Sequence, residues 1–83
     1  MAAVVKEAPA PHVLVVDDDI AVRQLVSEYL AQNDFRVSEA ASGAELMGAF
    51  RAQVVDLVLL DLRLHGEDGM QLLRQLRAES QLR

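Results

Sequence analysis

The chain has 83 residues, 52% of them hydrophobic and 25% charged, and its formal net charge is −5. This length allows one small domain with a thin core, and the apolar content argues against intrinsic disorder. The acidic balance disfavours direct nucleic-acid binding by this segment, because a phosphate backbone requires a basic surface. The lack of cysteine excludes disulfides and thiolate metal sites, and it is consistent with a cytoplasmic location.

Residues 1–11 end in a proline-rich segment, and we expect them to form a flexible leader. They lack the basic start and the long apolar core of a secretory signal. No stretch of the chain approaches the roughly twenty apolar residues that cross a bilayer. We therefore expect no membrane association, and we assign the folded domain to residues 12–83.

The first strand is expected at His12–Val16, an aliphatic run that stops abruptly at three acids, Asp17-Asp18-Asp19. We expect His12, which opens this strand, to be exposed. Asp18 or Asp19 is suited to cap a following helix, and for Asp19 we favour capping over a metal role. The inner face of that helix is indicated by apolar residues at helical spacing, namely Val22, Leu25, Val26, Tyr29 and Leu30.

A second strand and a second helix follow the turn at Asn33-Asp34. Phe35–Ala40 alternates apolar and polar residues, as a strand with one exposed side does. Ser42-Gly43-Ala44-Glu45 matches the capping box, in which a hydroxyl and a later carboxylate reciprocally satisfy free amides at a helix start. The inner side of this helix is assigned to Leu46, Met47 and Phe50.

A nearly continuous apolar run within Val54–Leu64 leads to a carboxylate, Asp61, and is typical of a strand buried on both faces. After a turn at Gly66–Gly69, a third helix follows, with Met70 as core filler and three leucines inward, Leu72, Leu73 and Leu76. Strands alternating with helices predict an α/β fold with a parallel sheet and right-handed crossovers. Because the first and third strands are the most apolar, we place them side by side, with the second strand at an edge.

In this arrangement Asp17 and Asp18 lie near Asp61, because the carboxyl ends of neighbouring parallel strands meet at one edge of the sheet. An isolated Asp61 would simply end its strand, but three crowded carboxylates repel one another unless a cation lies among them. A hard divalent ion, Mg²⁺ above all, fits an all-oxygen site completed by water and a phosphate group. One carboxylate can then attack a phosphoryl group while the others hold the metal.

These motifs resemble the receiver domain of bacterial two-component response regulators. The matching segments are Val13–Asp19 with Arg23 after it, and Asp56–Leu64 followed by Gly66 and Asp68-Gly69. The resemblance implies a flavodoxin-like (CheY-like) doubly wound parallel sheet, of which this chain holds three strands in the order 2-1-3 and three helices. Carried over by position, it implies that Asp61 is the phospho-acceptor, that Asp18 binds Mg²⁺ directly, and that Asp17 acts largely through water. Asp61 itself and the backbone carbonyl of Arg63 would be further metal ligands.

The resemblance also implies a function in phosphorelay signalling. The domain would accept a phosphoryl group on Asp61 from a sensor histidine kinase, as part of a transcriptional response regulator, and would not be an enzyme in its own right. A phosphohydrolase with an aspartate nucleophile is disfavoured, because that class has a second aspartate two residues later and Arg63 stands there. We expect the His65 side chain to be solvated rather than a ligand.

The chain departs from the family pattern in two places. His65 stands where many members have proline, and the sequence ends at Arg83, before the family's fourth and fifth strands with their phosphate-binding hydroxyl and lysine. The segment thus reads as a receiver truncated after its third helix. The alternative function is therefore a noncatalytic interaction fragment that has lost phosphotransfer. Such a fragment would either form a homodimer through the exposed Val55–Leu60 edge or be only partly ordered.

Overall fold

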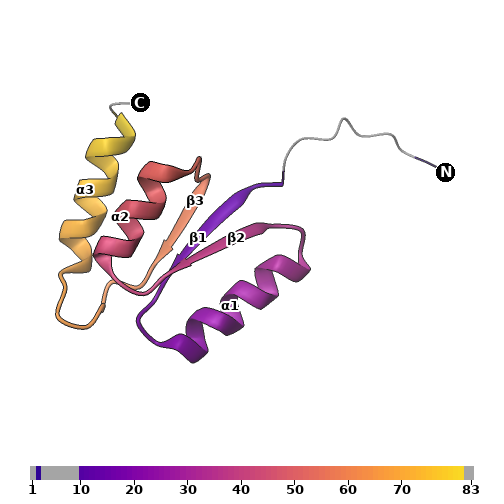
Figure 1. Cartoon of the computed structure of the whole chain (residues 1–83), viewed down its shortest axis with the longest axis horizontal. Coiled ribbons are helices and arrows are strands. Elements are labelled where there is room, and N and C mark those ends of the chain that lie inside the picture. Colours follow the sequence, from indigo (N-terminus) through magenta and orange to yellow (C-terminus); the bar gives the residue numbers. More distant parts are fainter. Residues whose placement is uncertain (1, 3–9, 82–83) are drawn as a thin grey trace.

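The structure is a computed structural model that describes residue 2 and residues 10–81. Its elements follow the order β1 (His12–Val16), α1 (Ile20–Gln32), β2 (Arg36–Ala40), α2 (Gly43–Ala52), β3 (Leu57–Leu60) and α3 (Gly69–Gln81), as Figure 1 shows. Most of the leader predicted at residues 1–11 lies outside the described residues, so that prediction stays untested. None of the helices within residues 10–81 has the length and apolar character needed to span a membrane.

The three strands form one parallel sheet in the order β2-β1-β3, which confirms the predicted α/β fold with strand order 2-1-3. Val13 pairs with Val37 on one side and Leu57 on the other, and Val16 pairs with Ala40 and Leu60. The central strand therefore ends level with both neighbours. The residues that follow β1 and β3 emerge together at one edge of the sheet, where we had placed the acids.

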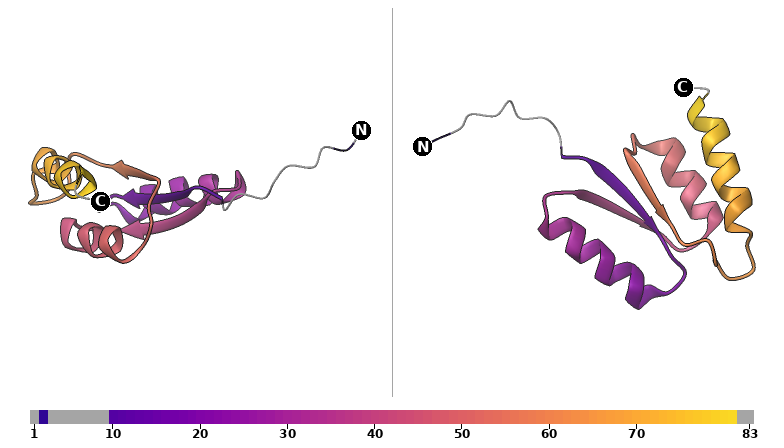
Figure 2. Two further views of the ribbon diagram at one scale, coloured as in Figure 1. Left: turned by 90° about the horizontal axis from the view of Figure 1, so that it is seen from above. Right: turned by 180° about the vertical axis from the view of Figure 1, so that it is seen from behind.

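One face of the sheet forms the core together with α2 and α3. Leu14 and Val16 of β1 are 0% and 1% exposed and belong to this hydrophobic core. The other buried members are Ala40, Leu46, Met47, Phe50, Leu64, Leu72 and Leu76. Figures 1 and 2 show α2 and α3 side by side, away from α1. An exposed ion pair also joins them, between Arg51 Nε and Glu79 Oε1 at 3.1 Å, and this hydrogen bond and the negative charge raise the pKa of Arg51.

The opposite face of the sheet is only partly covered. Helix α1 packs against β1 and β2, which buries Val13 and Val15. Leu57 and Leu59 of β3 are 50% and 39% exposed, so the prediction of a strand buried on both faces was wrong. The physical reason is that β3 pairs with β1 alone among the described residues, and α1 does not extend over it.

The predicted inner face of α1 was also wrong in part. Val26 and Leu30 are half-buried, but Val22, Leu25 and Tyr29 are exposed. Only one side of this helix meets the sheet, so the rest of its apolar stripe faces outward. Together with Leu57 and Leu59 it leaves an apolar surface on the α1 side of the protein.

The helix starts follow the predicted capping chemistry with one shift. Asp19 caps α1, since its Oδ1 accepts from the amides of Ala21 and Val22 at 3.0 and 3.3 Å. Ser42 caps α2 by accepting from the Glu45 amide at 3.2 Å. The Glu45 carboxylate accepts in return from the amide of Ala41, one residue before the position that a capping box predicts, at 3.4 Å.

Two further predictions about burial were wrong. His12 is 4% exposed, because its Nδ1 lies 2.8 Å from the Val54 carbonyl and its Nε2 lies 2.7 Å from Ser38 Oγ. These partners satisfy both ring nitrogens inside the protein. Met70 is 46% exposed rather than core filler, since the inward positions of α3 are occupied by leucines; Met47 is buried as predicted.

Candidate functional site

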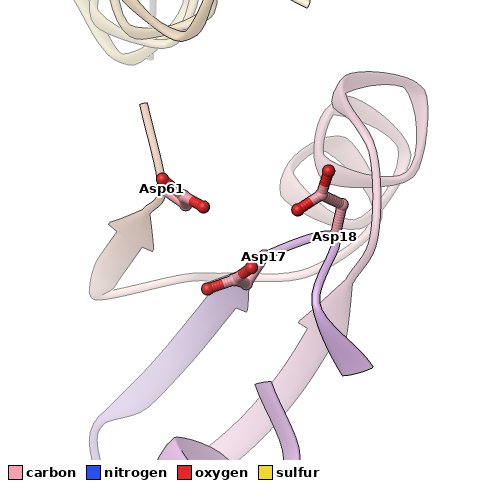
Figure 3. Close-up of side chains that lie close together, drawn as sticks. All are labelled: Asp17, Asp18 and Asp61. Atoms are coloured by element: carbon pink, nitrogen blue, oxygen red, sulfur yellow. The ribbon is translucent and has the colours of Figure 1, made fainter. Parts of the chain in front are cut away.

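Three carboxylates meet at the carboxyl edge of the sheet. Asp17 follows β1, Asp61 follows β3, and Asp18 lies in the loop that leads to α1 (Figure 3). One oxygen of each lies within 4.8 Å of one oxygen of both others. The structure thus brings together the three aspartates that the sequence analysis grouped. Two strand ends and one loop position them, so their spacing follows from the strand register.

A backbone amide holds each of the three carboxylates. Asp17 Oδ1 accepts from the Asp19 amide at 2.9 Å, and Asp61 Oδ1 accepts from the Arg63 amide at 2.9 Å. Asp18 Oδ2 accepts from the amide of His65 at 2.7 Å. Within residues 10–81 the second oxygen of each carboxylate has no protein donor. Each aspartate is therefore oriented and still has one oxygen that can bind a ligand.

No basic side chain within residues 10–81 forms an ion pair with these aspartates. Arg23 is the cationic group bound nearby, but its Nη1 donates to the backbone carbonyl of Asp17 at 2.9 Å. Its Nε donates to the Glu39 carboxylate at 3.0 Å. The guanidinium therefore fixes the loop after β1 and leaves the negative charge of the cluster uncompensated.

The donor set fits a small hard cation. Three carboxylates supply only oxygen ligands, which suits Mg²⁺ and excludes a thiolate or imidazole site. Asp17 and Asp61 are half-buried and Asp18 is exposed, so the cluster opens to solvent and can admit water and a substrate. The Arg63 side chain is exposed, as expected, and the metal role of its carbonyl stays a prediction.

The loop between β3 and α3 is built around a tight turn. The Glu67 amide donates to the Leu64 carbonyl at 3.0 Å, and Gly66 has a φ of 73°, which a side chain would disfavour. Leu64 is 3% exposed and anchors the loop in the core. At the end of the loop a Cβ on Gly69 would lie 2.5 Å from Leu62 Cα, so glycine is required by close packing there.

Sequence reasoning missed three contributions to this site. Arg23 was noted only as part of a motif, although its position six residues after Asp17 lets it reach back to that carbonyl. The His65 side chain is exposed as expected, but its backbone amide binds Asp18. Both carboxylate oxygens of Glu67 accept a bifurcated hydrogen bond from the Gly43 amide, a contact across 24 residues for which the sequence holds no signal.

Comparison with known proteins supports the resemblance to response regulator receiver domains. A family model described as response regulator receiver domain matches residues 13–83. The regulatory protein VirG of Agrobacterium tumefaciens (strain 15955) is 40% identical over 77 residues, which cover 93% of this chain and 29% of VirG. The transcriptional regulatory protein AruR of Pseudomonas aeruginosa is 42% identical over 80 residues, which cover 90% of this chain and 33% of AruR. The chain thus spans about a third of the length of these relatives.

Solved structures share the fold. The response regulator TrrA from Thermotoga maritima, in complex with Mg²⁺-BeF, superposes with a TM-score of 0.80 at 30% identity, over 86% of this chain and 62% of TrrA. The receiver domain of the TMAO respiratory system response regulator TorR superposes with a TM-score of 0.78 at 38% identity, over 83% of this chain and 57% of that domain. These neighbours confirm the predicted fold.

Proposed function

This chain belongs to the response regulator receiver domain family of two-component signalling, and we propose that it accepts a phosphoryl group on Asp61 with the help of Mg²⁺. The observation that carries the proposal is the convergence of Asp17, Asp18 and Asp61, whose ligand atoms lie within 4.8 Å of one another. A half-buried acid with two acidic neighbours and no basic partner among residues 10–81 is suited to a metal-assisted phosphoryl transfer.

Asp61 is the nucleophile in this proposal, through Oδ2. Its Oδ1 is held by the Arg63 amide at 2.9 Å, so the carboxylate is fixed with its other oxygen available. Oδ2 attacks the phosphorus of a phosphohistidine, the new O–P bond forms as the P–N bond breaks, and the imidazole leaves and takes up a proton from water. Asp18 would hold the cation directly and Asp17 largely through water, with Asp61 and the Arg63 carbonyl as further ligands. Bound Mg²⁺ screens the negative charge of the incoming phosphoryl group.

Three features support Mg²⁺ as the cation. The site offers only oxygen donors, it is open to water, and the structural neighbour TrrA was solved in complex with Mg²⁺-BeF. Arg23 contributes indirectly, because its hydrogen bond to the Asp17 carbonyl fixes the loop that carries two of the acids. We propose a stoichiometric signalling role rather than enzymatic turnover, since Arg63 stands where a phosphohydrolase needs its second aspartate.

The partner in this proposal is a sensor histidine kinase in the cytoplasm. The relatives VirG and AruR are named as regulatory and transcriptional regulatory proteins, which supports a role in transcriptional regulation. We assign no nucleic-acid contact to the 83 residues themselves, because their net charge is −5. Phosphorylation would act by changing the charge at the carboxyl edge of the sheet.

The proposal is tested by phosphate uptake from acetyl phosphate, measured by intact mass. We expect one hydroxylamine-labile phosphate in the presence of Mg²⁺, and none with EDTA or in Asp61→Asn. The matched control is Asp34→Asn, at an exposed turn residue with a φ of 68° that asparagine adopts equally well. Uptake that survives in Asp61→Asn, or no uptake by folded wild-type protein, would contradict the proposal.

One observation favours self-association as a second candidate function. Strand β3 pairs with β1 alone among the described residues, and its Leu57 and Leu59 are 50% and 39% exposed. A second copy can pair antiparallel with this edge and cover both leucines, which would extend the sheet across the dimer. In this alternative the segment acts as a noncatalytic interaction module and the acidic cluster is not phosphorylated.

Self-association is tested by light scattering on the protein eluting from a size-exclusion column. We expect a mass near twice 9.1 kDa for the wild type and a monomer for Leu59→Lys, because a charge at this edge opposes pairing. Leu62→Lys is the matched control, since Leu62 is 48% exposed but lies in the loop. A monomeric, folded wild-type protein would refute this alternative.

A further inference from the structure

The loop beside the acidic cluster is fastened to the start of α2 by one side chain, Glu67. Both oxygens of its carboxylate accept from the Gly43 amide, at 2.9 and 3.1 Å. Gly43 is the first residue of α2, so the carboxylate sits at the positive end of that helix. The contact joins two segments 24 residues apart. It is therefore a tertiary contact rather than a local turn.

Glu67 is linked to the acidic cluster through a hydrogen-bonded turn and the backbone amides near it. The Glu67 amide closes the turn on the Leu64 carbonyl at 3.0 Å, and this turn contains His65. The His65 amide then donates to Asp18 Oδ2 at 2.7 Å. Earlier in the same loop, the Arg63 amide donates to Asp61 Oδ1 at 2.9 Å. Two of the three carboxylates are thus oriented by amides of the segment that Glu67 fastens.

The start of α2 does not depend on Glu67 for its local caps. Ser42 accepts from the Glu45 amide, and Glu45 accepts from the Ala41 amide, so residues next to the helix already cap it. The additional carboxylate comes from the β3–α3 loop. Its main structural consequence is to fix that loop, since Leu64 anchors one end of the turn in the core and Glu67 anchors the other.

We propose that Glu67 is a positioning residue for metal binding by the acidic cluster. Through the turn at Leu64–Glu67 it holds the His65 amide against Asp18. The inference rests on the proposed function, since it assumes that Asp18 binds the cation. A carboxylate ligand whose other oxygen is fixed by an amide is already oriented for metal binding, and loss of such an orienting partner weakens metal affinity. Glu67 thereby couples the start of α2 to the geometry of the acidic cluster.

The test compares Glu67→Ala with Glu45→Ala. Both variants remove a carboxylate bound to an amide at or just before the start of α2, but only Glu67 belongs to the β3–α3 loop. Mg²⁺ affinity is measured by following backbone amide resonances during titration with the metal alone, and hydrogen exchange is measured at the His65 amide. We expect Glu67→Ala to weaken Mg²⁺ binding about tenfold, the lower end of the effect of removing an outer partner of a ligand. His65 exchange should become faster in this variant only.

A third variant separates positioning from general instability. In Glu67→Gln the side-chain oxygen can still accept from the Gly43 amide, so Mg²⁺ affinity should recover most of the way to wild type. Unchanged Mg²⁺ affinity and unchanged His65 exchange in Glu67→Ala overturn the inference, and so does tighter Mg²⁺ binding by this variant. An equal loss of Mg²⁺ affinity in Glu45→Ala also overturns it. If Glu67→Ala does not fold, Gly43→Ala decides, because its Cβ would clash with the Glu67 carboxylate. Weaker Mg²⁺ binding and faster His65 exchange in Gly43→Ala support the role, and wild-type values overturn it. Absence of Mg²⁺ binding by the wild type instead overturns the proposed function itself.

Discussion

Two glycines of α2 provide a sharp test of the packing around the site. Gly43 begins the helix and Gly48 lies in its middle. Among the described residues a Cβ on Gly48 would meet no atom within 4 Å, whereas a Cβ on Gly43 would clash with the Glu67 carboxylate and lie 2.8 Å from Leu72 Cδ2. Replacing each glycine by alanine therefore makes the same chemical change in two different surroundings.

The expected effects on the free energy of unfolding have opposite signs. Gly48→Ala should stabilise the protein by about 1 kcal/mol, because alanine is the better helix former in an open position. Gly43→Ala gains about 0.5 kcal/mol from the reduced freedom of the unfolded chain. It displaces Glu67, however, and loses the bifurcated hydrogen bond to a charged acceptor, which contributes about 2 kcal/mol. The net result is a loss of about 1.5 kcal/mol.

Urea unfolding followed by circular dichroism measures this difference. For a protein of this size the free energy of unfolding falls by about 1 kcal/mol per M urea. The urea concentrations at the unfolding midpoints of the two variants should therefore differ by about 2.5 M. The Gly43→Ala variant should unfold at the lower concentration. If both alanine variants were stabilised equally, Glu67 would not occupy the position next to Gly43, and the β3–α3 loop would not be fastened to α2.

Three further substitutions test individual contacts by the same unfolding measurement. Arg23→Met keeps the aliphatic length but removes the hydrogen bonds to Asp17 and Glu39, so it should lower the free energy of unfolding by about 1.5 kcal/mol. No loss of stability would mean that this guanidinium does not hold the loop. His12→Phe leaves the Val54 carbonyl without its ring donor and should cost about 2 kcal/mol, whereas a neutral result would contradict the buried hydrogen bonds. Leu46→Ala removes a side chain that is 0% exposed and should cost about 3 kcal/mol; a cost below about 1 kcal/mol would place Leu46 outside the core.

The sequence predicts the centre of this fold well. The aliphatic β1 and the alternation of strands and helices are sufficient to derive the parallel sheet and its order. The positions of Asp17 and Asp61 follow from that order, because each acid comes directly after a strand. The acidic cluster is therefore predictable without any knowledge of side-chain contacts.

Burial at the edges of the fold is not predictable in the same way. An apolar strand reads as buried on both faces, but the exposure of Leu57 and Leu59 depends on which neighbours lie beside and above β3. His12 shows the converse, since a polar residue is buried where Val54 and Ser38 happen to supply partners for its ring. In both cases the outcome depends on residues distant in the chain.

The contacts that orient the candidate site are also tertiary. The sequence identifies Asp18 as an acid near the cluster, but it does not show that the His65 amide binds it. Glu67 reads as one more polar loop residue, and its contact with Gly43 depends on how α2 and the β3–α3 loop meet. Composition and periodicity locate the carboxylates, whereas the structure is needed to show what holds them.

Identification of the phosphorylated residue is the most direct test of the proposed function. After incubation with acetyl phosphate and Mg²⁺, borohydride reduces an aspartyl phosphate to homoserine, which peptide mass spectrometry locates in the chain. We expect homoserine at Asp61 alone, and none when Mg²⁺ is withheld. Homoserine at Asp17 or Asp18, or labelling at Asp61 that does not depend on Mg²⁺, would contradict the assignment of acceptor and metal ligands.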